Sequence, residues 1–109
     1  MKLTFIYLPL PENILTNEEW QVVERLLLDN SAAEPVIPGT GGVRKLRVAF
    51  AHRGKSGSAR TAYVHVASKE KIYFLLAYAK NMQENLTSQQ KQAIRALVNV
   101  LKQERTGRI

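Results

Sequence analysis

Residues 44–79 decide the fold, and they read RKLRVAFAHRGKSGSARTAYVHVASKEKIYFLLAYA. Apolar and polar side chains alternate over Arg44–Ala51 and again over Arg60–Val66, which is the pattern of strands with one buried face. The third segment, Ile72–Ala79, is almost wholly apolar and is typical of a central strand covered on both faces. Because the links between the segments are short, we predict an antiparallel meander.

A strand and a helix are predicted before the meander. Leu3–Leu8 is rich in β-forming residues and stops at Pro9, which favours a strand. Thr16 and Glu19 have the spacing of a capping box, in which each side chain accepts a hydrogen bond from the other residue's backbone N–H. Four apolar residues of the helix that follows are expected to face the core: Trp20, Val23, Leu26 and Leu27.

A constrained loop and a second helix complete an α+β domain. Ala33–Gly42 contains two prolines and three glycines, which predicts several turns. Thr87 and Gln90 repeat the capping-box spacing at the start of the last helix. The apolar stripe of that helix is Ile94, Leu97, Val98 and Leu101. We find no repeat, low-complexity tract or linker, so residues 1–109 are predicted to form one domain.

Composition excludes several classes of protein. The chain is 45% hydrophobic, which is too apolar for a disordered polar chain, and it has no cysteine for a disulfide, a thiolate metal site or a cysteine nucleophile. No apolar run approaches the roughly 20 residues of a membrane helix. Leu3–Leu10 lacks the cleavage pattern of a secretion signal. We therefore expect a cytoplasmic protein with no membrane partner.

Positive charge is concentrated in the middle of the chain. The net charge is +7, and the segment Pro35–Asn81 alone holds nine basic residues and one acidic residue. The rest of the chain has seven basic and eight acidic residues. Taken by itself, such a field favours a polyanion, an acidic protein or an anionic membrane surface as partner, although a basic protein can also use its charge for solubility alone.

Common catalytic motifs are missing. Gly54–Ser56 is not a P-loop, because position 49 is alanine and the segment joins two predicted strands. Gly39–Gly42 is a turn, because the third glycine of a dinucleotide fingerprint is replaced by Arg44. The two histidines lack metal-ligand spacing, and no pair of carboxylates or serine triad is evident. What remains is a set of cations and tyrosines, which could form either a reactive RNA site or a binding face for nucleic acid.

Three motifs carry a resemblance to a known family. Pro38–Arg47 reads PGTGGVRKLR, Gly54–Arg60 reads GKSGSAR with Tyr63 after it, and Tyr73–Asn81 reads YFLLAYAKN. In this order and spacing they resemble the RelE/HigB family of bacterial toxins, in the branch with a GTGGxRKxR segment. The likeness covers roughly Ile37–Leu101. The turn departs from that branch, with Gly-Ser-Ala at positions 57–59 and His52 where glycine is common.

The resemblance implies a small RelE-like α+β toxin of a type II toxin–antitoxin pair. Such toxins enter the ribosomal A site and cleave messenger RNA during translation. Their partner is a protein antitoxin, which in this branch often carries a helix-turn-helix DNA-binding domain. The resemblance implies no metal and no cofactor.

The same resemblance assigns the site. Five cations are expected to be catalytic: Lys45, Arg47, Lys55, Arg60 and Lys80. Five further residues are expected to contact RNA: Arg44, Arg53, Tyr63, Tyr78 and Asn81. Arg47 and Arg60 would stabilise charge, Lys45 or Lys55 would be the base, and Lys80 the acid. Tyr78 or Tyr63 would stack on a base.

The implied reaction uses the RNA's own 2′-hydroxyl, which attacks the adjacent phosphate to give a cyclic phosphate and a free 5′-hydroxyl. DNA, which lacks that hydroxyl, is expected to be bound but not cut. Two alternatives stay open from the sequence. One is a toxin of the same fold that inhibits DNA gyrase, and the other is a non-catalytic nucleic-acid-binding module.

Overall fold

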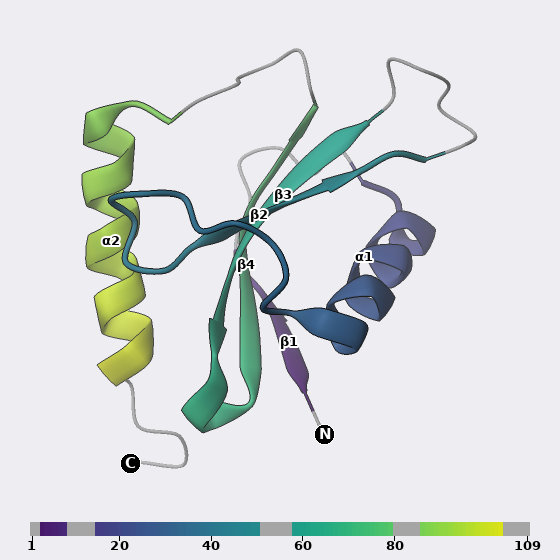
Figure 1. Cartoon of the computed structure of the whole chain (residues 1–109), viewed down its shortest axis with the longest axis horizontal. Helices are drawn as coiled ribbons and strands as arrows, with labels where there is room; N and C mark the ends of the chain where they lie inside the picture. The colour runs from purple at the N-terminus through teal and green to yellow at the C-terminus, as the bar shows by residue number, and fades with distance from the viewer. Residues whose placement is uncertain (1–2, 9–14, 51–57, 80–85, 104–109) are drawn as a thin grey trace.

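The structure, a computed structural model, describes residues 3–8, 15–50, 58–79 and 86–103 (Figure 1). A sheet lies between two helices, one on each side. In chain order the elements are β1 (Thr4–Tyr7), α1 (Asn17–Asn30), β2 (Arg44–Val48), β3 (Ala59–Val66), the short 3₁₀ helix η2 (Ala67–Lys69), β4 (Lys71–Ala79) and α2 (Ser88–Gln103). The α+β class predicted from the sequence is confirmed.

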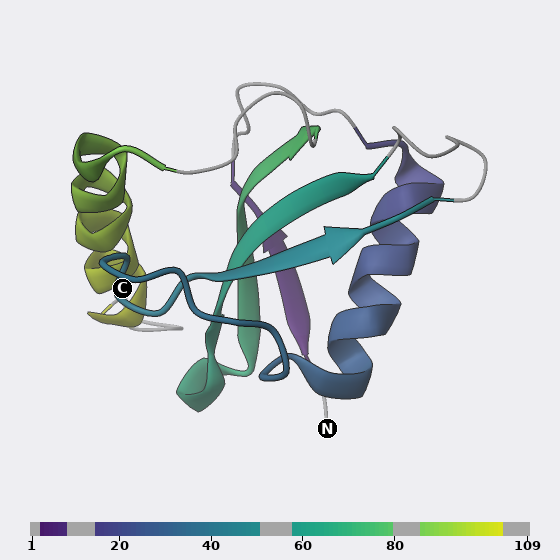
Figure 2. The same ribbon diagram turned by 45° about the horizontal axis from the view of Figure 1, so that its top comes forward.

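The sheet has the strand order β1-β4-β3-β2. β2, β3 and β4 form the predicted antiparallel meander, and β1 pairs parallel to β4 at the far edge. α1 covers one face and α2 the other, as both views show (Figure 2). In the part of the chain that the structure describes, neither helix is long and apolar enough to cross a membrane.

Both helices begin at the predicted capping boxes. Before α1, the Thr16 hydroxyl accepts from the Glu19 N–H at 3.1 Å, and the Glu19 carboxylate accepts from the Thr16 N–H at 2.9 Å. Before α2, Thr87 and Gln90 exchange the same pair of bonds at 2.9 and 3.1 Å. These bonds satisfy N–H groups that a helix start leaves without partners.

The α1 face of the sheet is a dense aromatic and aliphatic core. Trp20, Val23 and Leu27 pack on strand residues that include Tyr63 and Phe74. The Trp20 and Phe74 rings lie 5.0 Å apart, within the range of favourable aromatic pairs. One prediction is wrong here, because Leu26 is 44% exposed. The helical period puts Leu26 on the flank of the buried row rather than in it.

The α2 face carries a second core at one end only. Val98 and Leu101 of α2 are buried with Val64 and Val66 of β3. The predicted apolar stripe of α2 is narrower than expected, since Leu97 is 39% exposed and lies on the flank of the helix. Closer to the other end of β3, the α2 face changes from apolar to charged.

A β-bulge in β4 sets which side chains share that charged end. Ala62 pairs with Leu76, whereas Tyr63 pairs with Phe74, so Leu75 is an extra residue opposite β3. Leu75 and Leu76 both belong to the core on the α2 face. A bulge shifts the alternation of the strand by one residue. Tyr78 therefore lies on the α2 face, whereas a regular strand would place it on the α1 face with Phe74.

Candidate functional site

Two predicted cations and a predicted tyrosine form one row across the sheet. Arg47 of β2 is the register partner of Arg60 in β3, and Arg60 is the partner of Tyr78 in β4. Residues directly opposite on neighbouring strands project from the same face, with Cβ atoms roughly 4.5–5.5 Å apart. The row brings together side chains from three segments that the sequence keeps apart by 13 and 18 positions.

Arg60 is the most unusual member of this row. It is 1% exposed, whereas Arg47 beside it is exposed. Arginine is rarely buried to this degree, because removing a guanidinium from water is costly. Arg47 is the residue directly opposite Arg60, so two arginines come from neighbouring strands at one place. The row thus concentrates positive charge on this face, which is suited to binding an anion.

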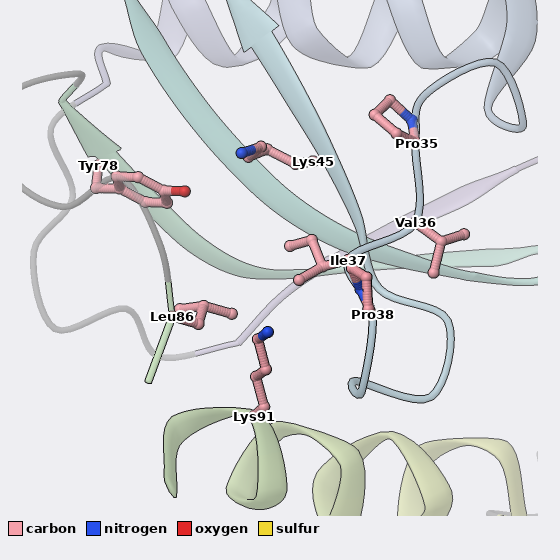
Figure 3. Close-up of a pocket in the computed structure, with 8 residues that line it drawn as sticks. All are labelled: Pro35, Val36, Ile37, Pro38, Lys45, Tyr78, Leu86 and Lys91. Atoms are coloured by element: carbon pink, nitrogen blue, oxygen red, sulfur yellow. The ribbon is translucent and has the colours of Figure 1, made fainter. Parts of the chain in front are cut away.

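Lys45 joins the same face two residues before Arg47. Its register partner on β3 is Ala62, whose methyl group leaves space above the middle strand. Lys45 and Tyr78 both line a cleft of about 250 Å³. Figure 3 shows the Lys45 ammonium and the Tyr78 hydroxyl pointing toward each other across this cleft. Lys45 and Arg47 lie on one face of β2, and their register places Arg60 and Tyr78 on the same face of the sheet.

The opposite wall of the cleft is formed by residues 35–38, which run along the free edge of β2. The Ile37 N–H donates to the Val43 carbonyl at 2.7 Å, and the Lys45 N–H donates to the Pro35 carbonyl at 3.2 Å. Thr40 closes the turn, because its hydroxyl donates to the Ile37 carbonyl at 2.6 Å. The wall is therefore fixed to the sheet by backbone hydrogen bonds.

The glycine turn that follows the wall is packed on α2. Gly41 has φ +81°, and a Cβ at this position would lie 3.4 Å from the Arg95 Cγ and 3.6 Å from the Val98 Cγ1. The Lys102 ammonium donates to the Gly41 carbonyl at 2.9 Å. Glycine is needed here for its positive φ and for the close approach to the helix. This turn couples the wall of the cleft to α2.

Lys91 of α2 completes the lining, and the sequence analysis missed it. Its side chain rises from the helix into the cleft, facing Leu86 and the 35–38 wall (Figure 3). One sequence signal was available. The first turn of α2 has no acidic residue, and Lys91, the fourth residue of the helix, adds a positive charge at the positive end of the helix macrodipole. A helix start that collects positive charge is suited to an anion.

Two residues predicted to contact RNA lie on the other face of the sheet. The Arg44 guanidinium donates to the Glu34 carbonyl, and Arg44 pairs in register with Tyr63. Tyr63 has no exposed surface, and its hydroxyl donates to the Ser31 carbonyl at 2.7 Å. Burial, reinforced by the charge of Glu34 and opposed by Arg44, raises the pKa of Tyr63 to about 12. The expectation that Tyr63 stacks on an RNA base does not fit this placement, because no part of the Tyr63 ring is exposed.

Four predicted site residues, Arg53, Lys55, Lys80 and Asn81, fall outside the described residues. Among the residues that are described, no group of three or more histidines and carboxylates is placed to hold a metal ion. Among the described residues, the candidate site therefore consists of a cleft lined by Lys45, Tyr78 and Lys91, with two arginines, one buried and one exposed, on the same face of the sheet.

This combination of a meander, two flanking helices and a cation-lined cleft agrees with the family comparison. The family described as the RelE toxin of the RelE / RelB toxin–antitoxin system matches residues 36–108, about two thirds of the chain. The chain belongs to the RelE toxin family. It is the toxin of a toxin–antitoxin pair, and its family implies a protein antitoxin as partner.

Proposed function

We propose that this toxin is a ribosome-dependent endoribonuclease that cleaves messenger RNA in the ribosomal A site. The observation that carries the proposal is the row Arg47–Arg60–Tyr78 beside Lys45. A phosphate bound at Arg47 would accept charge-assisted hydrogen bonds from its exposed guanidinium. The buried Arg60, directly opposite on β3, would add its positive charge to the same site.

The chemistry proposed for the row needs no nucleophile from the protein. The 2′-hydroxyl of the RNA attacks the adjacent phosphorus, the bond to the 5′-oxygen of the next nucleotide breaks, and a cyclic phosphate and a 5′-hydroxyl result. Arg47 and Arg60 would stabilise the additional negative charge of the phosphorane. Lys45 would remove the proton of the 2′-hydroxyl, and Lys80 would protonate the leaving oxygen.

Tyr78 has a different task in this proposal. Its ring lies at the end of the row and lines the cleft. A tyrosine in this position supports stacking on an unpaired base, which would hold the RNA bent around the cleaved phosphate. In-line attack requires such a bend, because the 2′-oxygen must lie opposite the leaving 5′-oxygen.

The test is induced expression followed by mapping of messenger RNA ends. The proposal predicts new 5′-hydroxyl ends in phase with codons of translated messages, and no cuts in the same message when its start codon is removed. Intact messages together with DNA breaks would contradict the proposal and would favour gyrase as the target. Codon-independent cuts in untranslated RNA would contradict the requirement for the ribosome.

A further inference from the structure

We infer that the cleft between the 35–38 wall and α2 is a subsite for one unpaired nucleotide next to the cleaved bond, with Lys91 binding its phosphate. This inference rests on the proposed function, because it names the part of the substrate that lies beside the row of arginines. It adds a residue from α2 to a site otherwise made from the sheet.

The lining of the cleft has two chemically distinct parts. One is apolar and comes from Pro35, Ile37, Pro38 and Leu86. The other is polar and consists of Lys45, Tyr78 and Lys91 (Figure 3). An unpaired nucleotide has the same two parts, since its base offers an apolar face and its phosphate carries a negative charge. A purely electrostatic binding surface for duplex backbone would not need the apolar wall.

The size of the cleft limits its occupant. Its volume of about 250 Å³ lies just below the range of roughly 300–1,000 Å³ typical of sites for drug-sized ligands. The cleft therefore suits one nucleotide of a strand that extends beyond it. The base of a duplex, which is stacked and paired, would not enter it.

The wall is also preorganised for a ligand. Hydrogen bonds from Ile37 and Lys45 fix residues 35–38 to β2, and Gly41 holds the following turn against α2. Little ordering entropy is lost on binding when the walls of a site are already fixed. Lys91 has one neighbour suited to a comparison, because Arg95 lies one turn later on the same helix and does not line the cleft.

The test measures binding of an uncleavable, 2′-O-methylated RNA hexamer to the full chain by fluorescence anisotropy. A second hexamer carries a neutral methylphosphonate in place of one flanking phosphate, with each position scanned in turn. Lys91→Gln is expected to weaken binding of the first hexamer by about tenfold, the effect of one charge-assisted phosphate contact. With the methylphosphonate at one particular position, the same substitution is expected to change nothing. This is the signature of a direct coupling in a double-mutant cycle.

The control variant is Arg95→Gln, which removes the same charge from the same helix. It is expected to weaken binding of every hexamer slightly and equally, as a change in the overall field does. An abasic nucleotide at the coupled position should weaken binding to the wild type on the order of tenfold through loss of base stacking in the cleft.

Three outcomes would overturn the inference. They are equal losses for Lys91→Gln and Arg95→Gln, a Lys91→Gln effect that no methylphosphonate removes, and no binding of the hexamer by the wild type. Failure of the proposed function alone looks different. In that case the coupling at Lys91 is present, but no message is cleaved on the ribosome.

Discussion

The two faces of the sheet are formed by the same strands but carry different kinds of side chain. The α1 face is closed by Trp20, Val23 and Leu27 and is filled with aromatic rings. On the α2 face, every second residue of β3 faces α2, and the series runs from Val66 and Val64 through Ala62 to Arg60. One end of this face is therefore core, and the other end carries the row of arginines beside the cleft. The α1 face thus contributes to the core, whereas the α2 face combines a core at one end with concentrated positive charge at the other.

The largest expected effect is the loss of stability when the core on the α1 face is disrupted. Trp20→Ala removes the ring that contacts Tyr7 and Phe74. We expect it to lower the free energy of unfolding by about 3–5 kcal/mol, as for other buried aromatics. Leu26→Ala, on the exposed flank of the same helix, should change it by less than about 0.5 kcal/mol. Chemical denaturation of both variants measures the difference, and comparable losses would show that α1 packs along a different row.

Substitutions of Tyr78, on the α2 face, and Tyr63, on the α1 face, test whether the two faces have different functions. Tyr78→Ala is expected to weaken RNA binding by about 1–3 kcal/mol, the contribution of one stacked base, and to lower stability less than Trp20→Ala does, because Tyr78 is only half-buried. Tyr63→Phe is expected to affect stability and not RNA binding. It removes the hydroxyl that donates to the Ser31 carbonyl and should lower stability by about 1 kcal/mol without affecting RNA binding. Loss of RNA binding in folded Tyr63→Phe would contradict the assignment of the two faces.

A substitution of Arg47 tests whether the opposed positive charges on the α2 face lower the stability of the protein. Arg47→Thr removes one of two opposed positive charges and introduces a residue that favours strands. We expect the free energy of unfolding to rise by about 0.2–1 kcal/mol while messenger RNA cleavage falls. A variant that is both less stable and less active would show that Arg47 contributes to the fold and that the repulsion is negligible.

The smallest expected effect is a dependence of stability on pH at the α1 face. The His65 ring nitrogen Nδ1 lies 2.7 Å from the Ser31 hydroxyl, and burial together with the charge of Arg44 lowers the pKa of His65. The unfolded chain then binds the proton more readily than the folded protein. Stability is therefore lost as the pH falls below about 6.5. His65→Gln should reduce the difference in stability between pH 7.5 and pH 5, and an unchanged difference would exclude His65 as its source.

Much of this fold could be predicted from local chemistry. The capping boxes at Thr16 and Thr87 and the alternation of β2 and β3 depend on residues close in sequence, so they were correctly predicted. The bulge at Leu75 was not, because β4 is apolar on both faces and its composition does not indicate where the alternation shifts. Lys91 was missed for a related reason, since its place beside the cleft depends on how α2 packs against a distant loop.

The structure brings together only some of the residues that the sequence analysis assigned to the site. Lys45 and Arg47 share a face because strand alternation requires it, and the structure adds Arg60 and Tyr78 to that face. Arg44 and Tyr63 were grouped with them from motif position alone. The same alternation puts both on the opposite face, so the period of the strand was a better guide than proximity in the motif.

The most direct test of the central claim is the single-turnover rate of messenger RNA cleavage on programmed ribosomes with Arg60→Gln. If Arg60 stabilises the charged transition state, the rate should fall by about 10²–10³-fold, as when one oxyanion donor is removed. Thermal unfolding must show a folded variant, and Arg95→Gln should cleave within about twofold of the wild type, as expected for a surface cation outside the cleft. A folded Arg60→Gln variant that cleaves at the wild-type rate would contradict the account.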